Sequence, residues 1–158
     1  MADSHDNKLG VLAAARVFRD RQIGLLLHAG DYIAPFTAGW LTDVGAPMIG
    51  VFGNNDGEKF GLRARFADLG DIHRAPHPFE YEGKRFVMLH EPDEVDALAD
   101  SGYYDVLVYG HTHEVDLREG GKTLVINPGE TGGWTTGRST VAVLDLSTMA
   151  VEIVDLDV

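Results

Sequence analysis

Seven side chains of metal-ligand type recur along the chain in short motifs. They carry two carboxylates, one amide oxygen and four imidazoles: Asp3, His5, Asp31, Asn54, His90, His111 and His113. Such a set is too large for one tetrahedral zinc ion, and it suits two borderline divalent ions that share a bridging carboxylate. A pair of ions of this kind catalyses in-line displacement at phosphorus. The residue types therefore predict a dinuclear metal centre for phosphoester chemistry.

Most of these side chains lie just after a short apolar run, where a strand would end and a loop begin. Asp31, His90 and His111 each stand within a few residues of such a run. Sheets of α/β proteins keep their active sites at strand ends of this kind. Each motif has a simpler interpretation alone, since Asp-Ser can cap a helix and Gly-Asn-Asn-Asp-Gly is typical of a left-handed turn. Their number and order indicate one site.

Together, the motifs resemble those of the calcineurin-like metallophosphoesterases, in particular the small single-domain phosphodiesterases of archaea and bacteria. The residues that carry the resemblance are Asp3-x-His5, Gly30-Asp31, Gly53-Asn54-Asn55-Asp56, His90, Gly110-His111-Thr112-His113 and Asn127-Pro128-Gly129. They span nearly the whole chain. Glu91-Pro92 departs from the His-Gly pattern that the family commonly has there, and this departure concerns the substrate pocket more than the metals.

The resemblance implies how the ligands divide between two ions. Asp31 would bridge them. One ion would be bound by Asp31 together with Asp3, His5 and His113. The other would be bound by Asp31 together with Asn54, His90 and His111. Water held between the ions would attack phosphorus, and the catalytic roles would fall to Asp31, Asn54 and His90. Manganese is the ion we favour, while Fe²⁺, Zn²⁺ and Ni²⁺ stay open because nitrogen and oxygen ligands do not separate them.

The same resemblance predicts a hydrolase of phosphoesters, and among these of phosphodiesters with good leaving groups. In larger members of the superfamily a histidine that protonates the leaving oxygen follows the ligand asparagine. Here that position is Asn55, whose amide cannot release a proton. The alternative is a non-catalytic interaction subunit on the same fold, like the retromer subunit of this superfamily, in which metal ligands are partly lost. Every ligand position is kept in this chain.

Several other polar residues have open roles. Asp56 is expected either to orient a histidine or a water, or to cap the following helix. The segment 127–130 is expected to shape a turn near the site, and Trp134 either to flank a substrate base or to cover the core. His73 and His77 match no motif, and we interpret them as surface residues of a loop.

Length, composition and charge narrow the classes of protein to which this chain can belong. A chain of 158 residues predicts one domain spanning residues 1–158. The absence of cysteine excludes a disulfide scaffold, a zinc-thiolate site and a cysteine nucleophile. A net charge of −12 repels polyanions, so a small phosphoester is the expected partner rather than extended nucleic acid. With no membrane-length apolar run and no signal peptide, we predict a cytoplasmic protein without a membrane partner. A homo-oligomer is compatible with this composition.

The hydrophobic pattern predicts an α/β fold, a two-sheet β-sandwich flanked by helices. Helical spacing of apolar residues and helix-start signals predict helices over 8–21, 35–44, 58–69 and 92–101. Short apolar or alternating runs predict strands over 24–28, 47–52, 79–81, 85–89, 106–109, 114–118, 123–126, 140–144 and 150–154.

One element of the resembling family has no counterpart in this sequence. In that family an apolar strand precedes Asp-x-His and lies in the middle of a sheet, whereas only Met1 and Ala2 precede Asp3 here. A sheet without a central strand loses two hydrogen-bonded neighbours. We therefore predict that the first strand is missing and that the natural reading frame begins upstream, with roughly five apolar residues. Otherwise Asp3 and His5 should be poorly anchored.

Overall fold

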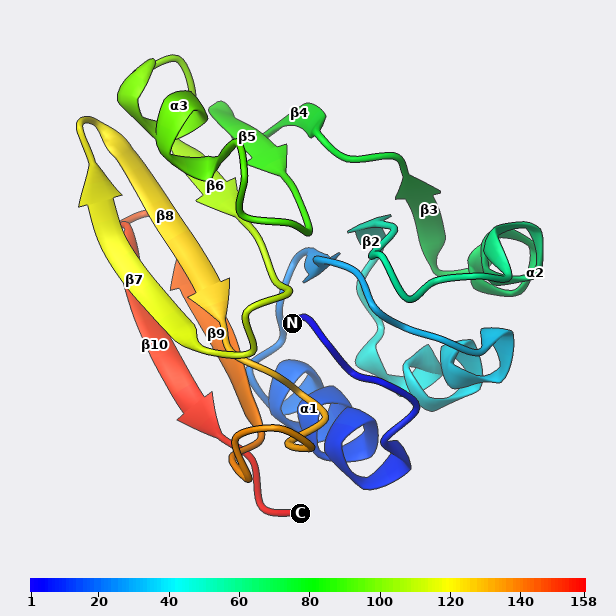
Figure 1. Ribbon diagram of the computed structural model, residues 1–158. Coiled ribbons are helices and arrows are strands. Elements are labelled where there is room, and N and C mark those ends of the chain that lie inside the picture. Colours follow the sequence, from blue (N-terminus) through cyan, green and yellow to red (C-terminus); the bar gives the residue numbers. More distant parts are fainter.

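A computed structural model describes residues 1–158 as ten strands with helices around them (Figure 1). The helices are α1 (Lys8–Asp20), η1 (Pro35–Trp40), η2 (Thr42–Val44), α2 (Lys59–Phe66) and α3 (Val95–Asp100). The strands are β1 (Leu26–His28), β2 (Met48–Val51), β3 (Gly70–His73), β4 (His77–Tyr81), β5 (Lys84–Met88), β6 (Val106–Val108), β7 (Val115–Gly120), β8 (Thr123–Pro128), β9 (Thr140–Asp145) and β10 (Ala150–Asp155). None of the helices is long and apolar enough to cross a membrane.

The first helix forms where the sequence predicts it. The Asn7 side chain accepts hydrogen bonds from the backbone N–H groups of Leu9 and Gly10, which would otherwise lack partners at the helix start. Val11 and Phe18 on its inner face are buried. This burial is what fixes α1 against the sheet, because a helix of this length is marginal by itself in water.

The strands form three sheets. In the first, β1, β2 and β3 are parallel neighbours. The second has the order β4-β5-β6-β8-β7, parallel in its middle and antiparallel at both edges. The third is the antiparallel pair of β9 and β10. The predicted α/β class with flanking helices is confirmed, but the sequence predicted two sheets, and no strand in the structure joins β1 to β9.

The sheets face one another, and the helices cover the outside (Figure 1). Successive side chains of a strand point to opposite faces. Along β5, Phe86 and Met88 therefore enter the core between the sheets, whereas Val87 packs with the residues under α3. On the opposite face of the β1-β2-β3 sheet, Leu26 of β1 and Phe66 of α2 share a second core with α1. This packing holds the carboxyl ends of the parallel strands in fixed relative positions.

Two stretches differ from the sequence-based prediction. The helix expected over 35–44 is two short 3₁₀ helices, neither of which has a capping side chain. Residues 70–73, expected in the loop after the helix over 58–69, form β3 beside β2. Here Gly70 approaches Met48 so closely that an added Cβ would lie 1.8 Å from its carbonyl oxygen. A short polar strand of this kind has no apolar pattern by which it could be found.

The first three residues are held on both sides. The Met1–Asp3 backbone exchanges hydrogen bonds with Ala29 and Gly30 after β1, and it accepts hydrogen bonds from Thr131 and Gly132 after β8. All three residues are buried. Asp3 is therefore anchored in this structure by the segments that follow β1 and β8.

An apolar groove of about 100 Å³ lies beside Met1, between β1 and β9. β1 pairs with β2 as its only strand neighbour, and β9 pairs only with β10. Each of these two strands thus has one edge without a strand partner along the groove. The groove is lined by Met1, Phe18, Ile23, Leu25, Leu26, Leu27, Val108, Ile126, Pro128, Ala142, Val143 and Leu144.

Candidate metal centre

The structure brings all seven predicted ligand side chains together at one edge of the sandwich. They lie in the N-terminal segment and in the loops that follow β1, β2, β5 and β6. Most of them share an unusual backbone, since a positive φ is uncommon for residues other than glycine and tends to cluster at functional sites. Those with φ between 42° and 72° are Asp3, His5, Asp31, His111 and His113. The backbone strain of this protein is therefore concentrated at the predicted site.

Asp3, His5 and His113 form a first group of donors. The Nε2 atoms of His5 and His113 lie 3.9 Å and 3.6 Å from Asp3 Oδ1. These distances exceed the about 2.7–3.2 Å of a hydrogen bond. They are close to the roughly 3–3.6 Å that separates two ligand atoms bound to one ion at about 2.1 Å each. His5 Nε2 is also buried without any hydrogen-bond partner. The donor set therefore fits a divalent cation.

Asn54, His90 and His111 form a second group. Asn54 Oδ1 lies 2.8 Å from His90 Nε2 and 2.9 Å from His111 Nδ1. The other ring nitrogen of His90, Nδ1, lies 2.8 Å from the carbonyl oxygen of Ala29 and donates to it. A neutral His90 then turns a lone pair, not a proton, toward the oxygen of Asn54. Two acceptors this close need a cation between them, either a proton or a metal ion.

Asp31 stands between the two groups. Its Oδ2 atom lies 3.4 Å from His5 Nε2 and 3.5 Å from His90 Nε2. Burial by itself would raise the pKa of Asp31, but His90 and the amide of Asn55 outweigh burial and hold the pKa below its usual range. Burial lowers the pKa of His90, but the carboxylate of Asp31 outweighs it and raises this pKa above its usual value. Asp31 is thus an anion placed where two cations could share it.

Asp3 is supported differently. Its carboxylate is fully buried and accepts hydrogen bonds from the backbone N–H of His111, at 3.2 Å and 3.0 Å. Burial raises the pKa of Asp3 to about 6, against the lowering effect of His90 and His113. Without a cation this carboxylate is costly to ionise, and a bound cation would remove that cost. His5 is also tied to the site by its backbone, which donates to the carbonyl oxygen of Asp31.

Asp56 organises the loop that carries Asp31. Its two carboxylate oxygens accept hydrogen bonds from the backbone N–H groups of Asp31, Tyr32, Ile33 and Gly53, at 2.8–3.1 Å. The sequence predicted that Asp56 would orient a histidine or a water, or cap the next helix. The expected cap is wrong, because Glu58 is the residue at the start of α2 and no side chain caps it. The hydrogen-bond partners of Asp56 include no histidine, and a contact with water stays a prediction.

Two supporting contacts at the site were not predicted from the sequence. Asn55 donates hydrogen bonds to both oxygens of Asp31. Glu130 is fully buried, and its Oε2 lies 2.9 Å from His113 Nδ1. Glu130 follows the Asn-Pro-Gly motif, which was interpreted only as a turn. His73 and His77, whose rings stack at 3.6 Å, take no part in these contacts.

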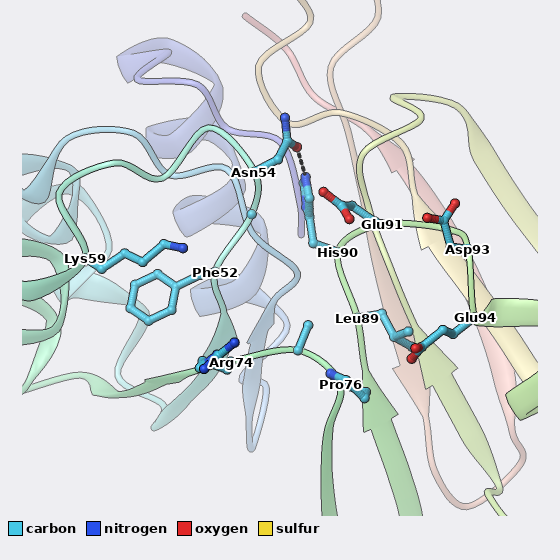
Figure 2. A pocket seen from close by; sticks show the side chains of 12 residues that line it. Phe52, Asn54, Lys59, Arg74, Pro76, Leu89, His90, Glu91, Asp93 and Glu94 are labelled. Atoms are coloured by element: carbon cyan, nitrogen blue, oxygen red, sulfur yellow. Dashed lines mark hydrogen bonds between the residues drawn. The ribbon is translucent and has the colours of Figure 1, made fainter.

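A pocket of about 340 Å³ opens beside the second group of donors (Figure 2). Asn54 and His90 form one end of it. Figure 2 shows cationic side chains on one wall and carboxylates on the opposite wall. The lining residues that carry charge are Lys59, Arg74, Glu91, Asp93 and Glu94. Glu91, which departs from the family motif, is therefore part of this pocket.

Comparison with known proteins identifies the class to which this fold and site belong. Residues 1–149 match the model of the calcineurin-like phosphoesterase superfamily domain, and the chain belongs to this superfamily. Phosphodiesterase MJ0936 of Methanocaldococcus jannaschii is 33% identical over 149 residues, which are 92% of this chain and 90% of that protein. The resemblance predicted from the motifs is confirmed.

Solved structures agree with this assignment. A structure described as a novel archaeal phosphodiesterase is similar at a TM-score of 0.94 and 32% identity, covering 99% of this chain and 97% of that one. Vps29 of Chaetomium thermophilum is similar at a TM-score of 0.71 and 18% identity, covering 100% of this chain and 94% of that one. At that identity the second comparison shows a shared fold only.

Proposed function

We propose that this protein is a hydrolase of phosphodiesters that uses two divalent ions bridged by Asp31. The observation that carries the proposal is the position of Asp31 Oδ2, which lies within 3.5 Å of an imidazole nitrogen from each donor group. One ion would be held by Asp3, His5, Asp31 and His113. The other would be held by Asp31, Asn54, His90 and His111. Manganese is the proposed ion.

The protein's own residues prepare the site for this chemistry. When bound, the ions supply Lewis-acid catalysis and a nucleophile at neutral pH. Asp31 and Asp3 contribute two negative charges, while the neutral oxygen of Asn54 limits the negative charge near an incoming phosphate. His90 is held by Ala29, so its Nε2 points to the centre. Because these groups are fixed before substrate arrives, little reorganisation is required in the transition state.

The pocket supplies room for the organic part of the substrate. It begins at Asn54 and His90, so a phosphorus atom near the second donor group would place one ester substituent inside it. Lys59 lies over the ring of Phe52 at 5.5 Å, which gives this wall both a charge and an apolar surface. The relatives that are phosphodiesterases support a diester as substrate.

A non-catalytic interaction role on this fold is the competing proposal, and the shared fold with Vps29 is its basis. The assembled donor groups favour the enzyme. Their buried carboxylates and the unpartnered nitrogen of His5 would only destabilise a protein that bound no metal.

Hydrolysis of an aryl phosphodiester such as bis(4-nitrophenyl) phosphate tests the proposal. With Mn²⁺ the protein should turn the ester over, and a chelator should abolish the activity. His90→Ala should lower kcat by at least about 10²-fold, as expected for the loss of a group that helps to hold a catalytic ion. His73→Ala, outside the site, is the matched control and should leave the rate unchanged. No turnover by the wild-type protein with any of the four candidate ions would favour the interaction role.

A further inference from the structure

Glu130 is a buried carboxylate that lies outside both donor groups yet contacts one of their histidines. It follows β8, and its side chain is fully buried. It accepts hydrogen bonds from the backbone N–H groups of Trp134, Thr135 and Thr136, at 2.5–3.2 Å. The hydroxyl of Thr136 donates to it at 2.7 Å. Four donors of this loop therefore hold one buried carboxylate in a fixed orientation.

This buried carboxylate fixes the orientation of His113. The Nδ1 atom of His113 lies 2.9 Å from Glu130 Oε2, so it carries the proton of the neutral ring and donates it. Nε2 is then left with a free lone pair, and it lies 3.6 Å from Asp3 Oδ1. A carboxylate behind a histidine ligand fixes the ring's tautomer and raises its basicity toward a metal.

The loop that Glu130 organises also braces the rest of the first donor group. The indole N–H of Trp134 donates to the carbonyl oxygen of His5 at 3.1 Å. The N–H of Gly132 donates to the carbonyl oxygen of Asp3 at 3.0 Å. One short loop therefore touches Asp3 and His5 through its backbone and indole, and His113 through Glu130. Its hydrogen bonds reach none of Asn54, His90 and His111.

We propose that Glu130 is the positioning residue of the first metal site, and that it sets the affinity of this site independently of the second. Trp134 would report the occupancy of this site, because its indole N–H donates to the carbonyl oxygen of His5 and its backbone N–H donates to Glu130. This inference rests on the proposed metal centre, and it adds a role for a residue that contacts neither ion. Trp134 is 67% exposed, so a rearrangement of the loop would change the contact of its indole with water and therefore its emission.

Metal titration of the intact protein tests the proposal. Isothermal titration with Mn²⁺ should show two binding steps in the wild-type protein. Glu130→Gln should weaken one step by about 10–100-fold, the usual effect of losing a carboxylate behind a ligand histidine, and leave the other step unchanged. Glu119→Gln, on the exposed face of β7, is the matched control and should change neither step. Equal weakening of both steps, or of neither, would overturn the proposal.

A second variant assigns the affected step. His113→Ala should weaken the same step at least as strongly, and in that background Glu130→Gln should not weaken it further, because the two residues act through one contact. If Glu130→Gln does not fold, Glu130→Asp replaces it. The shorter side chain keeps the charge but cannot reach both His113 and the loop, so it should weaken the same step selectively. Independent effects of the two substitutions would contradict the proposal.

Fluorescence gives a readout that needs no turnover. The chain has two tryptophans, so Trp40→Phe leaves Trp134 as the only tryptophan, which excitation at the red edge of its absorption selects over the tyrosines. Zn²⁺ is used here because it is not paramagnetic and does not quench fluorescence by that route. Its addition should change the emission over the concentration range in which Zn²⁺ fills the site that Glu130→Gln weakens. An emission change that coincides with filling of the other site would contradict the reporter role of Trp134. A wild-type protein that binds no ion at all would refute the metal centre itself. A wild-type protein that binds two ions, of which Glu130→Gln weakens neither selectively, would refute only the role of Glu130.

Discussion

Asn55 and Asp31 are joined by two hydrogen bonds. The backbone N–H of Asn55 donates to Asp31 Oδ1 at 2.9 Å, and its side-chain amide donates to Asp31 Oδ2 at 2.7 Å. The amide is therefore directed at the proposed bridging carboxylate. Asn55 stabilises the ionised form of Asp31, which is the form that a metal requires. It cannot act as an acid toward a leaving group.

The first prediction follows for substrate preference. Without a residue at position 55 that can release a proton, a poor alkoxide leaving group should depart slowly, whereas a stabilised aryloxide can leave unaided. General-acid assistance is typically worth about 10²–10⁴-fold, so aryl diesters should exceed alkyl diesters of similar size by a margin of this order. The measurement is kcat for both ester types at saturating Mn²⁺. Equal turnover would show that another group donates the proton.

The second prediction concerns Asp56, whose carboxylate satisfies four backbone N–H groups around Asp31. Asp56→Ala leaves these buried donors without partners, and it should lower the free energy of unfolding by roughly 3–5 kcal/mol. Denaturant unfolding measures the change. Asp71→Ala, at an exposed position of β3, is the control and should stay within about 0.5 kcal/mol of wild type. A comparably small effect at Asp56 would mean that water replaces the carboxylate.

The third prediction uses the pKa of Asp3, which burial raises to about 6 in the metal-free protein. A carboxyl whose pKa is higher in the folded state opposes folding above that pKa, and this opposition disappears as the pH falls toward the unfolded value of about 3.9. Metal-free Asp3→Asn should therefore be more stable than wild type at pH 8, by at most roughly 3 kcal/mol. The advantage should shrink near pH 5.

Thermal unfolding with and without Mn²⁺ measures this effect. With Mn²⁺ present the order should reverse, since the wild-type carboxylate binds the ion and its stabilisation grows with ligand concentration. If Asp3→Asn were less stable than wild type at pH 8 even without metal, the carboxylate would have partners beyond those seen here.

Much of this fold could be predicted because it is encoded locally. The Asn7 cap and the apolar spacing of α1 specify the first helix, and the Glu82-Gly83 turn between alternating strands specifies the β4–β5 hairpin. The seven ligand residues were found for a similar reason, as each stands in a recognisable motif. By contrast, β3 is defined by its backbone pairing with β2, a contact that forms only in the folded chain and leaves no local sequence pattern.

The supporting contacts of the site are long-range, and this is why the sequence did not predict them. Glu130 lies 17 residues from His113, and Asn55 lies 24 residues from Asp31. Hydrophobic periodicity reports which face of an element is buried, but it carries no information on which polar side chains will meet. The contacts of Asp56 were not predicted for the same reason, since three of its four partners lie in the loop that follows another strand.

The fourth prediction concerns the groove between β1 and β9. Both strands have a free edge there, and the walls are apolar. An added segment of about five apolar residues before Met1 should pair with these edges and join two sheets into one. Its amide would also replace the buried amino group of Met1, whose pKa burial lowers to about 5. Such an extension should raise Tm by several degrees, and a serine-glycine extension of equal length should not. Equal Tm values would show that the groove accepts no strand.

The fifth prediction is the most direct test of a dinuclear centre bridged by Asp31. Crystals of the protein grown with Mn²⁺ should show two anomalous-scattering peaks about 3.5–4 Å apart, with a carboxylate oxygen of Asp31 in contact with both. Metal analysis should give close to two ions per chain, and Asp31→Asn should lose at least one of them together with the activity. A single peak, or two peaks of which only one contacts Asp31, would contradict the bridged centre.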